Sequence, residues 1–182
     1  MPRSTTQDIA RAGLFTALLV VGALVSLPVG SVPFTLQVFV VLLAGMLLGP
    51  RVASLSVAAY LALGLVAPVY AGGASGLAVL FGPTGGYLWG FLPAVLVSGL
   101  LAGGKPCSVP RFVVAGLAGL LPVYVLGASW LAVELGLTAR AAFVAGVAPF
   151  VWLDALKAIG AAFVAKGLVS LPQGLPASGR DQ

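Results

Sequence analysis

VWLDALKAIGA, residues 151 to 161, places Asp154 and Lys157 inside a segment that is otherwise nearly all apolar. Side chains three residues apart on a helix share one face, with their Cβ atoms about 5–6 Å apart. Charged side chains inside a bilayer are costly, almost always face the protein interior, and by default mark a functional site. The stretch therefore predicts a membrane helix with a polar site on one face.

The composition of the whole chain predicts an integral membrane protein. Of 182 residues, 60% are hydrophobic and 7% are charged, and the mean hydropathy is +1.16, whereas soluble domains carry about 25% charged residues. The 25 glycines suit close packing in lipid, where small residues let helix backbones approach. No stretch shows the period-two alternation of a transmembrane barrel, so the expected fold is an all-α bundle of transmembrane helices.

Apolar segments separated by Pro and Gly predict a single domain, residues 1–182, with six membrane spans. The expected spans are residues 9–27, 33–49, 52–69, 84–103, 112–135 and 142–167. Several are shorter than the roughly 20 residues that cross a bilayer squarely, so irregular helices are expected. Pro149 should bend the last span and open space near Asp154. The glycine-rich region between the third and fourth spans should re-enter the membrane or cap the bundle over an outward-facing pocket.

The basic residues predict that both termini are cytoplasmic, because Lys and Arg favour that side of the membrane. Six spans with an internal N-terminus leave only Arg140 outside. The residues then placed inside are Arg3, Arg11, Arg51, Lys105, Arg111, Lys166 and Arg180. The net charge of +5 thus reflects topology, and no basic stripe with interleaved aromatic residues indicates nucleic-acid binding.

The sequence contains no complete motif for nucleotide binding, metal binding or catalysis. GLLAGGK at residues 99–105 matches the first part of a nucleotide-binding loop, but Pro106 stands where the magnesium-binding Ser or Thr should be, and no strand precedes it. The chain has no histidine and one cysteine, Cys107, which argues against a zinc site or an internal disulfide. Without a nucleophile–base pair, we expect neither an enzyme nor a bound cofactor or metal.

The Asp154–Lys157 pair has two interpretations. The two charges can neutralise one another, or Lys157 can extend its long stem toward a membrane interface, and the pair is then structural. Alternatively, the pair lines a pocket, where the ammonium attracts a carboxylate or carbonyl and the carboxylate accepts N–H bonds. The functional interpretation is favoured over the structural one by odds of about three to two.

Two further motifs lie near the expected outer side. GPTGGYLWGF, residues 82–91, contains successive glycines that let the backbone approach a ligand or take positive φ, and Thr84 adds a hydroxyl. Aromatic side chains can cover an apolar ligand, although Tyr and Trp also populate the membrane–water belt without one. These aromatic residues are Tyr70, Phe81, Tyr87, Trp89, Phe91 and Trp152.

Four motifs together resemble BioY, the biotin-specific substrate-binding (S) component of energy-coupling factor (ECF) transporters. They are VPFTLQVF at 32–39, LLGP at 47–50, GPTGGYLWGF at 82–91 and D-x-x-K at 154–157. The resemblance implies a six-helix protein of a prokaryotic cytoplasmic membrane that captures biotin from the outer face. It also implies as partners a transmembrane coupling protein and two ATPase subunits, consistent with the incomplete nucleotide-binding motif of this chain.

The resemblance also implies which residues act. The expected ligand-binding residues are Asp154, Lys157, Thr84, Gly85, Gly86, Tyr87, Gly73, Ser75 and Trp152. Asp154 would accept a ureido N–H of biotin, and Lys157 would pair with the carboxylate or another ligand oxygen. One relative has an Asn where this chain has Ala74, so that contact is absent or replaced by Ser75. Gly13 and Ala17 form a small-xxx-small face on the first helix, where the coupling protein is expected to dock.

Two alternatives stay open. The chain can be an S component for another vitamin, such as thiamin or riboflavin. It can also be a membrane scaffold subunit without a ligand, in which the charged pair only holds helices together.

Overall fold

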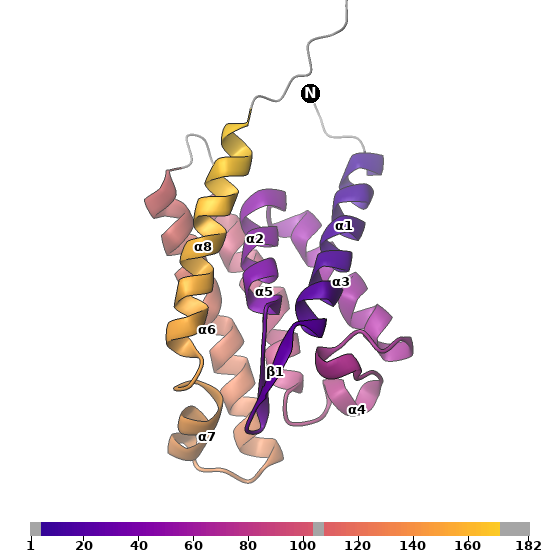
Figure 1. Cartoon of the computed structure of the whole chain (residues 1–182), viewed down its shortest axis with the longest axis vertical. Helices are drawn as coiled ribbons and strands as arrows, with labels where there is room; N and C mark the ends of the chain where they lie inside the picture. The colour runs from indigo at the N-terminus through magenta and orange to yellow at the C-terminus, as the bar shows by residue number, and fades with distance from the viewer. Residues whose placement is uncertain (1–4, 104–107, 172–182) are drawn as a thin grey trace, which may run out of the picture.

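The computed structural model describes residues 5–103 and 108–171, which fold into a helical bundle with most helices running along one long axis (Figure 1). Arg3, Lys105, Pro106, Cys107 and Arg180 lie outside the described residues. The elements are α1 (Thr5–Leu24), β1 (Ser26–Val29), β2 (Val32–Thr35), α2 (Gln37–Leu48), α3 (Pro50–Val66), the 3-10 turn η1 (Ala71–Gly73), α4 (Leu77–Leu80), α5 (Gly85–Ala102), α6 (Val109–Glu134), α7 (Ala139–Gly146) and α8 (Val151–Ser170).

The helices have the length and apolarity that a membrane requires. In the described part of the chain, four helical segments can span a bilayer, and a fifth is added if α7 and α8 are counted as one bent span. Helix α2 is apolar but has only 12 residues, so it is shorter than a square crossing needs. The prediction of a mostly helical membrane fold is confirmed, although the chain is not all-α because it also contains a short β-hairpin, and the number of six spans stays a prediction.

A short antiparallel hairpin joins α1 to α2 where the sequence suggested only a loop and the start of a helix. Strand β1 pairs with β2, and Pro28 lies opposite Pro33. Gly30 takes φ +60 in the turn, a conformation that favours glycine. Helix α2 therefore begins at Gln37 and not at the expected residue 33, because residues 32–35 pair with residues 26–29 as an extended strand. The hairpin tip points toward the end of the bundle that holds α4 and α7 (Figure 1).

The last predicted span is bent, as Pro149 suggests. Helices α7 and α8 meet at 52° across the break that contains Pro149. Since Pro cannot donate a backbone hydrogen bond, it interrupts a continuous helix at this point. The break leaves Asp154 in the first turn of α8, one turn before Lys157, which bonds to Thr35 at the end of the hairpin that is remote from its turn.

Glycine brings helices α5 and α6 together along the bundle. A Cβ on Gly90 would lie 2.8 Å from the Cα of Val123, and one on Gly86 would lie 2.5 Å from the carbonyl oxygen of Leu126. Only residues without a side chain allow two helix backbones this close. The abundance of glycine in the sequence thus corresponds to helix packing at these positions.

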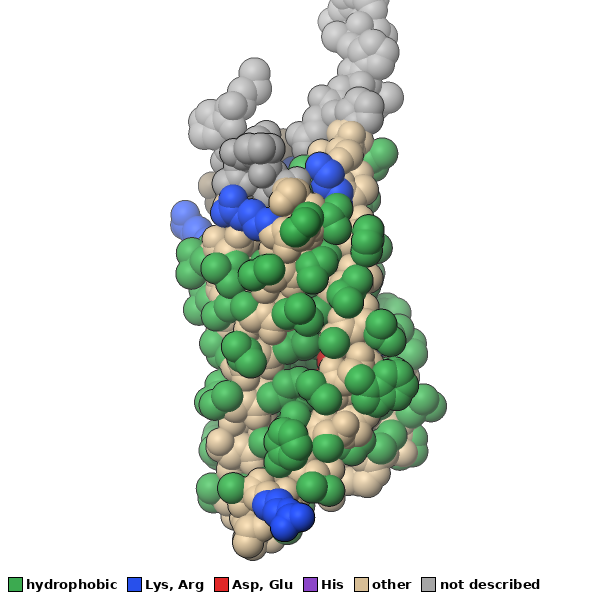
Figure 2. Space-filling model, turned by 90° about the vertical axis from the view of Figure 1, so that its left-hand side faces the viewer, with side chains coloured by type: hydrophobic (Ala, Val, Ile, Leu, Met, Phe, Trp, Pro, Cys, Tyr) green, Lys and Arg blue, Asp and Glu red, His purple; other side chains and the backbone are tan. Residues whose placement is uncertain are grey.

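The outer surface suits a bilayer. Figure 2 shows hydrophobic side chains over the middle of one side of the bundle, with Lys and Arg side chains toward its two ends. Arg11, Arg51, Arg111 and Lys166 belong to helix ends at one end of the bundle, whereas Arg140 lies in α7 at the opposite end (Figure 1). Apart from Lys157, the described basic residues are therefore divided between the two ends of the bundle as the sequence predicts.

Candidate ligand-binding site

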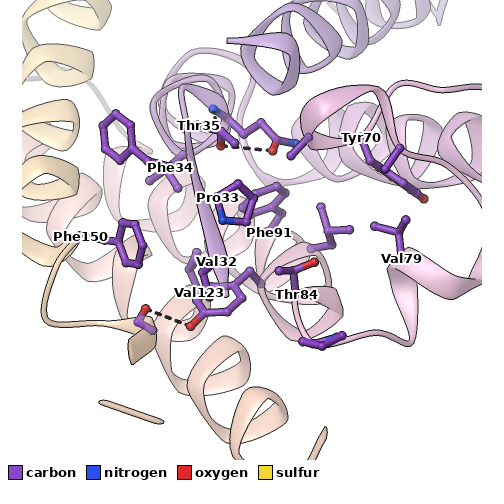
Figure 3. Close-up of a pocket in the computed structure, with 18 of the residues that line it drawn as sticks. Val32, Pro33, Phe34, Thr35, Tyr70, Val79, Thr84, Phe91, Val123 and Phe150 are labelled. Atoms are coloured by element: carbon purple, nitrogen blue, oxygen red, sulfur yellow. Dashed lines mark hydrogen bonds between the residues drawn. The ribbon is translucent and has the colours of Figure 1, made fainter. Parts of the chain in front are cut away.

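A cavity of about 320 Å³ lies between the hairpin, the segment from Tyr70 to Thr84, and helices α5, α6 and α8. Its volume is at the lower end of the range for small-molecule sites, which are mostly apolar with a few placed polar groups. Figure 3 shows the apolar part of its wall, to which hairpin and helices contribute. These apolar residues include Val32, Pro33, Phe34, Val79, Phe91, Val123 and Phe150.

Asp154 and Lys157 form an ion pair that lines this cavity. Lys157 Nζ lies 2.7 Å from Asp154 Oδ1 and donates a second bond of 2.6 Å to the backbone carbonyl of Thr35 in β2. The ammonium also lies 3.6 Å from the ring centroid of Phe34, in the geometry of a cation–π contact. The pair thus joins α8 to the hairpin.

Both interpretations of the pair describe part of this geometry. The two charges neutralise each other, and both side chains are largely buried. Lys157 does not extend toward a membrane interface, because its ammonium is held by Asp154 and Thr35. Removing one partner of a buried pair leaves an uncompensated charge and typically costs about 3–5 kcal/mol. The pair is therefore a structural link that also presents a donor and an acceptor to the cavity.

A second polar group adjoins the pair through Thr35. The Thr35 hydroxyl donates to Gln37 Oε1 over 3.2 Å (Figure 3), and Gln37 Nε2 donates to the Tyr60 hydroxyl over 2.7 Å. Tyr60 in turn donates to the Val69 carbonyl over 3.3 Å. Gln37 is 3% exposed and lines the cavity. Buried polar groups need such partners, so this chain of bonds fixes the Gln37 amide beside Thr35.

Aromatic side chains hold the segment that covers the cavity. Trp89 donates through Nε1 to the Leu80 carbonyl over 3.1 Å, and Trp130 donates to the Gly82 carbonyl over 3.0 Å. These bonds fasten the residues before α5 onto α5 and α6. Tyr87 lines the cavity and donates to the Gly146 carbonyl over 2.9 Å, which ties α5 to the end of α7.

The structure brings four of the predicted site residues to the cavity. Asp154 and Lys157 reach it from α8, Thr84 from the segment before α5, and Tyr87 from the first turn of α5. Tyr70 and Phe91, which the sequence singled out as aromatic candidates, line it as well. These residues are far apart in the chain, and the bundle gathers them around one space.

The other predicted site residues lie away from the cavity lining. Gly85 packs against the Leu80 carbonyl and Gly86 against Trp130, so the space beside them is filled by the protein. Gly73 takes φ +77 in η1 and is exposed, like Ser75. Trp152 is 60% exposed, because two residues along a helix turn a side chain about 200° away from Asp154. Ala71 and Ala74 line the cavity from the glycine-rich segment instead.

Sequence reasoning missed four polar or aromatic contributors. Phe34 and Thr35 come from the unexpected hairpin, and Tyr124 donates its hydroxyl to Asp154 Oδ2 over 2.6 Å from α6. Gln37 carried the same signal as Asp154, a lone polar residue at the edge of an apolar run. Within residues 5–103 and 108–171, no cluster of three His, Cys, Asp or Glu could hold a metal ion.

Known proteins are similar to this chain in sequence and in fold. The model of the BioY family matches residues 1–173. A protein of Thermotoga maritima named "Biotin transporter BioY" is 45% identical over 166 residues, which cover 91% of this chain and 97% of the relative. A protein of Pyrococcus horikoshii named "Probable biotin transporter BioY" is 42% identical over 163 residues, covering 89% of this chain and 96% of the relative.

A solved structure has the same architecture. The crystal structure at 2.1 Å of the S-component for biotin from an ECF-type ABC transporter superimposes with a TM-score of 0.79. The two chains are 28% identical, and the match covers 92% of this chain and 94% of the other.

Proposed function

The chain belongs to the BioY family, and from that premise we propose that it binds biotin as the substrate-specific S component of an ECF-type vitamin transporter. The names of the relatives and of the solved structure support this function over an S component for another vitamin. The observation that carries the proposal is the Asp154–Lys157 pair on the wall of an otherwise apolar cavity.

The pair matches one edge of a cyclic urea. On that edge an N–H donor and the carbonyl acceptor stand side by side. Asp154 offers a carboxylate acceptor, and Lys157 offers an ammonium donor, with the two atoms 2.7 Å apart. A charged partner makes each of these hydrogen bonds stronger than a neutral one would be. Asp154 therefore accepts a ureido N–H, and Lys157 donates to the ureido oxygen.

Charge balance determines the orientation of biotin in the cavity. Because Lys157 is already neutralised by Asp154, a carboxylate buried beside the pair would add an uncompensated negative charge, which is costly in an apolar site. The neutral ureido ring thus fits beside the pair, and the valerate carboxylate points toward the end of the bundle where Thr84 lies. This arrangement favours the ligand carbonyl over the ligand carboxylate as the partner of Lys157.

The rest of the cavity suits the apolar part of biotin. Phe34, Phe91 and Phe150 line it together with aliphatic side chains, and such walls are what small-molecule sites present to an apolar ligand body. Thr84 and Tyr87 complete the proposed binding residues toward the glycine-rich segment, which covers the cavity on the side of α4.

The placement in the membrane follows from the basic residues. The end of the bundle with Arg11, Arg51, Arg111 and Lys166 is assigned to the cytoplasm, since Lys and Arg favour that side. The cavity then opens toward the outer face, and both termini are cytoplasmic. The protein is accordingly a multi-pass protein of the prokaryotic cytoplasmic membrane.

Energy for uptake is supplied by partner subunits. Residues 99–102 of the incomplete nucleotide-binding motif belong to the last turn of α5, and a Cβ on Gly99 would lie 2.7 Å from the backbone nitrogen of Pro50. The glycine there serves helix packing and not a phosphate-binding loop. A transmembrane coupling protein and two ATPase subunits are the proposed partners.

Binding of labelled biotin to the detergent-purified chain tests the function. We expect one biotin per chain, displaced by unlabelled biotin and not by excess thiamin or riboflavin. The pair on the cavity wall complements the urea edge that biotin presents, which is the physical reason for this selectivity. Displacement by thiamin or riboflavin would point to another vitamin, and a folded protein that retains no biotin would support the scaffold alternative.

A further inference from the structure

Tyr124 contacts the charged pair from a helix that sequence reasoning did not connect with it. Its hydroxyl, which α6 supplies, donates to Asp154 Oδ2 over 2.6 Å, and the side chain lines the cavity. A hydrogen bond to a carboxylate at this length is a strong one. The contact joins residues 30 positions apart in the chain.

The two oxygens of Asp154 have different partners. Lys157 holds Oδ1, and Tyr124 holds Oδ2. Each carboxylate oxygen has two lone-pair sites, so each can still accept one further bond from a ligand. The terminal torsion of an Asp side chain is broad when nothing holds it. Two partners on opposite oxygens fix the plane of the carboxylate, and with it the direction in which a ligand N–H must arrive.

We propose that Tyr124 is a positioning residue that sets the specificity of the site by holding Asp154 Oδ2, so that the carboxylate is oriented to accept one ligand N–H. The inference rests on the proposed function, because biotin is the ligand that supplies the N–H. It extends that function by assigning the selection for N–H-bearing cyclic ureas to a contact between α6 and α8.

Tyr124→Phe removes only the hydroxyl and is the variant to test. We expect purified Tyr124→Phe to bind biotin about tenfold more weakly than the parent, equivalent to about 1.4 kcal/mol. In an Asp154→Asn background the same change should cost little more, because the group that Tyr124 positions is already altered. Ser98→Ala is the matched control: Ser98 is buried and donates to Ala94 over 2.7 Å within α5, away from the cavity, so its loss should leave the biotin affinity unchanged.

A ratio of two affinities separates positioning from a general structural role. The second ligand is a biotin analogue methylated on both ureido nitrogens, measured by competition. The preference of the parent for biotin over this analogue should fall about tenfold in Tyr124→Phe, since only biotin uses the oriented carboxylate. A partly unfolded variant would bind both ligands less in equal proportion and leave the ratio unchanged.

The results of these binding experiments distinguish the role of Tyr124 from the biotin-binding function itself. If the parent binds biotin and Tyr124→Phe keeps both the affinity and the ratio, Tyr124 does not position Asp154, while the biotin function stands. An equal loss for both ligands in a Tyr124→Phe variant that remains folded also overturns the specificity role. If the folded parent binds no biotin, the proposed function fails, and the role of Tyr124 fails with it.

Discussion

Lys157→Met should reduce biotin affinity by about 100-fold or more in the purified chain. The substitution keeps much of the side-chain length but removes the charged donor to the ureido oxygen, and a hydrogen bond to a charged group contributes up to about 3 kcal/mol, where tenfold in affinity corresponds to about 1.4 kcal/mol. It also removes the bond to the Thr35 carbonyl and leaves the Asp154 carboxylate buried without its cation, which lowers the stability of the fold itself. Equilibrium binding of labelled biotin measures the effect.

Asp154→Asn should weaken binding by more than tenfold, because Lys157 loses its counter-charge and the ligand N–H loses a charged acceptor. The double variant Asp154→Asn with Lys157→Met has no unpaired charge, so it separates binding from folding. We expect it to remain folded but not to recover biotin binding. Leu156→Met is the control on the same helix, since Leu156 is 58% exposed and lies outside the cavity lining.

The pair is structural only if these variants give the opposite result. Single variants that remain folded and bind biotin as tightly as the parent would show that neither side chain contacts the ligand. A double variant with the parent's affinity would lead to the same conclusion.

Gly13→Leu should remove most biotin uptake while leaving biotin binding intact. Ala10, Gly13 and Ala17 form an exposed face of small residues on α1, and a Cβ on Gly13 would meet no atom within 4 Å. Small residues on such a face let another helix approach closely, and the proposed occupant is the coupling protein. A Leu side chain would hold that helix away, so we expect uptake by cells that carry the complete transporter to fall more than tenfold.

Gly167→Leu provides the matched control for this face. Gly167 lies in α8 and is exposed, and a Cβ added there would likewise meet no atom within 4 Å, yet it belongs to a different side of the bundle from α1. Uptake with Gly167→Leu should stay near that of the parent. Uptake that survives Gly13→Leu unchanged would argue against docking on α1, and lost biotin binding would indicate damage to the chain itself.

The sequence identifies the charged pair because charges in an apolar helix are rare and costly. It identifies Thr84 and Tyr87 because they follow a run of Pro and Gly that interrupts the helices. It misplaces Trp152, since nearness in sequence to Asp154 does not mean a shared helix face. The glycines at 85 and 86 attracted a ligand interpretation, but the space beside them is taken by Leu80 and Trp130.

Other parts of the site depend on pairings that one sequence does not reveal. The contact of Tyr124 with Asp154 requires the register of α6 against α8, which packing decides. The hairpin carries Phe34 and Thr35 to the cavity, although prolines usually argue against strands. An isolated two-stranded hairpin is marginal by itself, so its form here depends on contacts such as the bond from Lys157 to Thr35.

Protection of a single cysteine by biotin tests most directly whether the ligand occupies this cavity. Val79 lines the cavity, whereas Leu77, two residues earlier in α4, is 62% exposed and lies outside the lining. Val79→Cys and Leu77→Cys would each be made with Cys107→Ser, and their rates of reaction with a small thiol reagent compared with and without biotin. We predict that biotin slows labelling at position 79 over the concentration range in which it binds, and leaves position 77 unaffected. Retained biotin with unchanged labelling at position 79 would show that the ligand binds elsewhere.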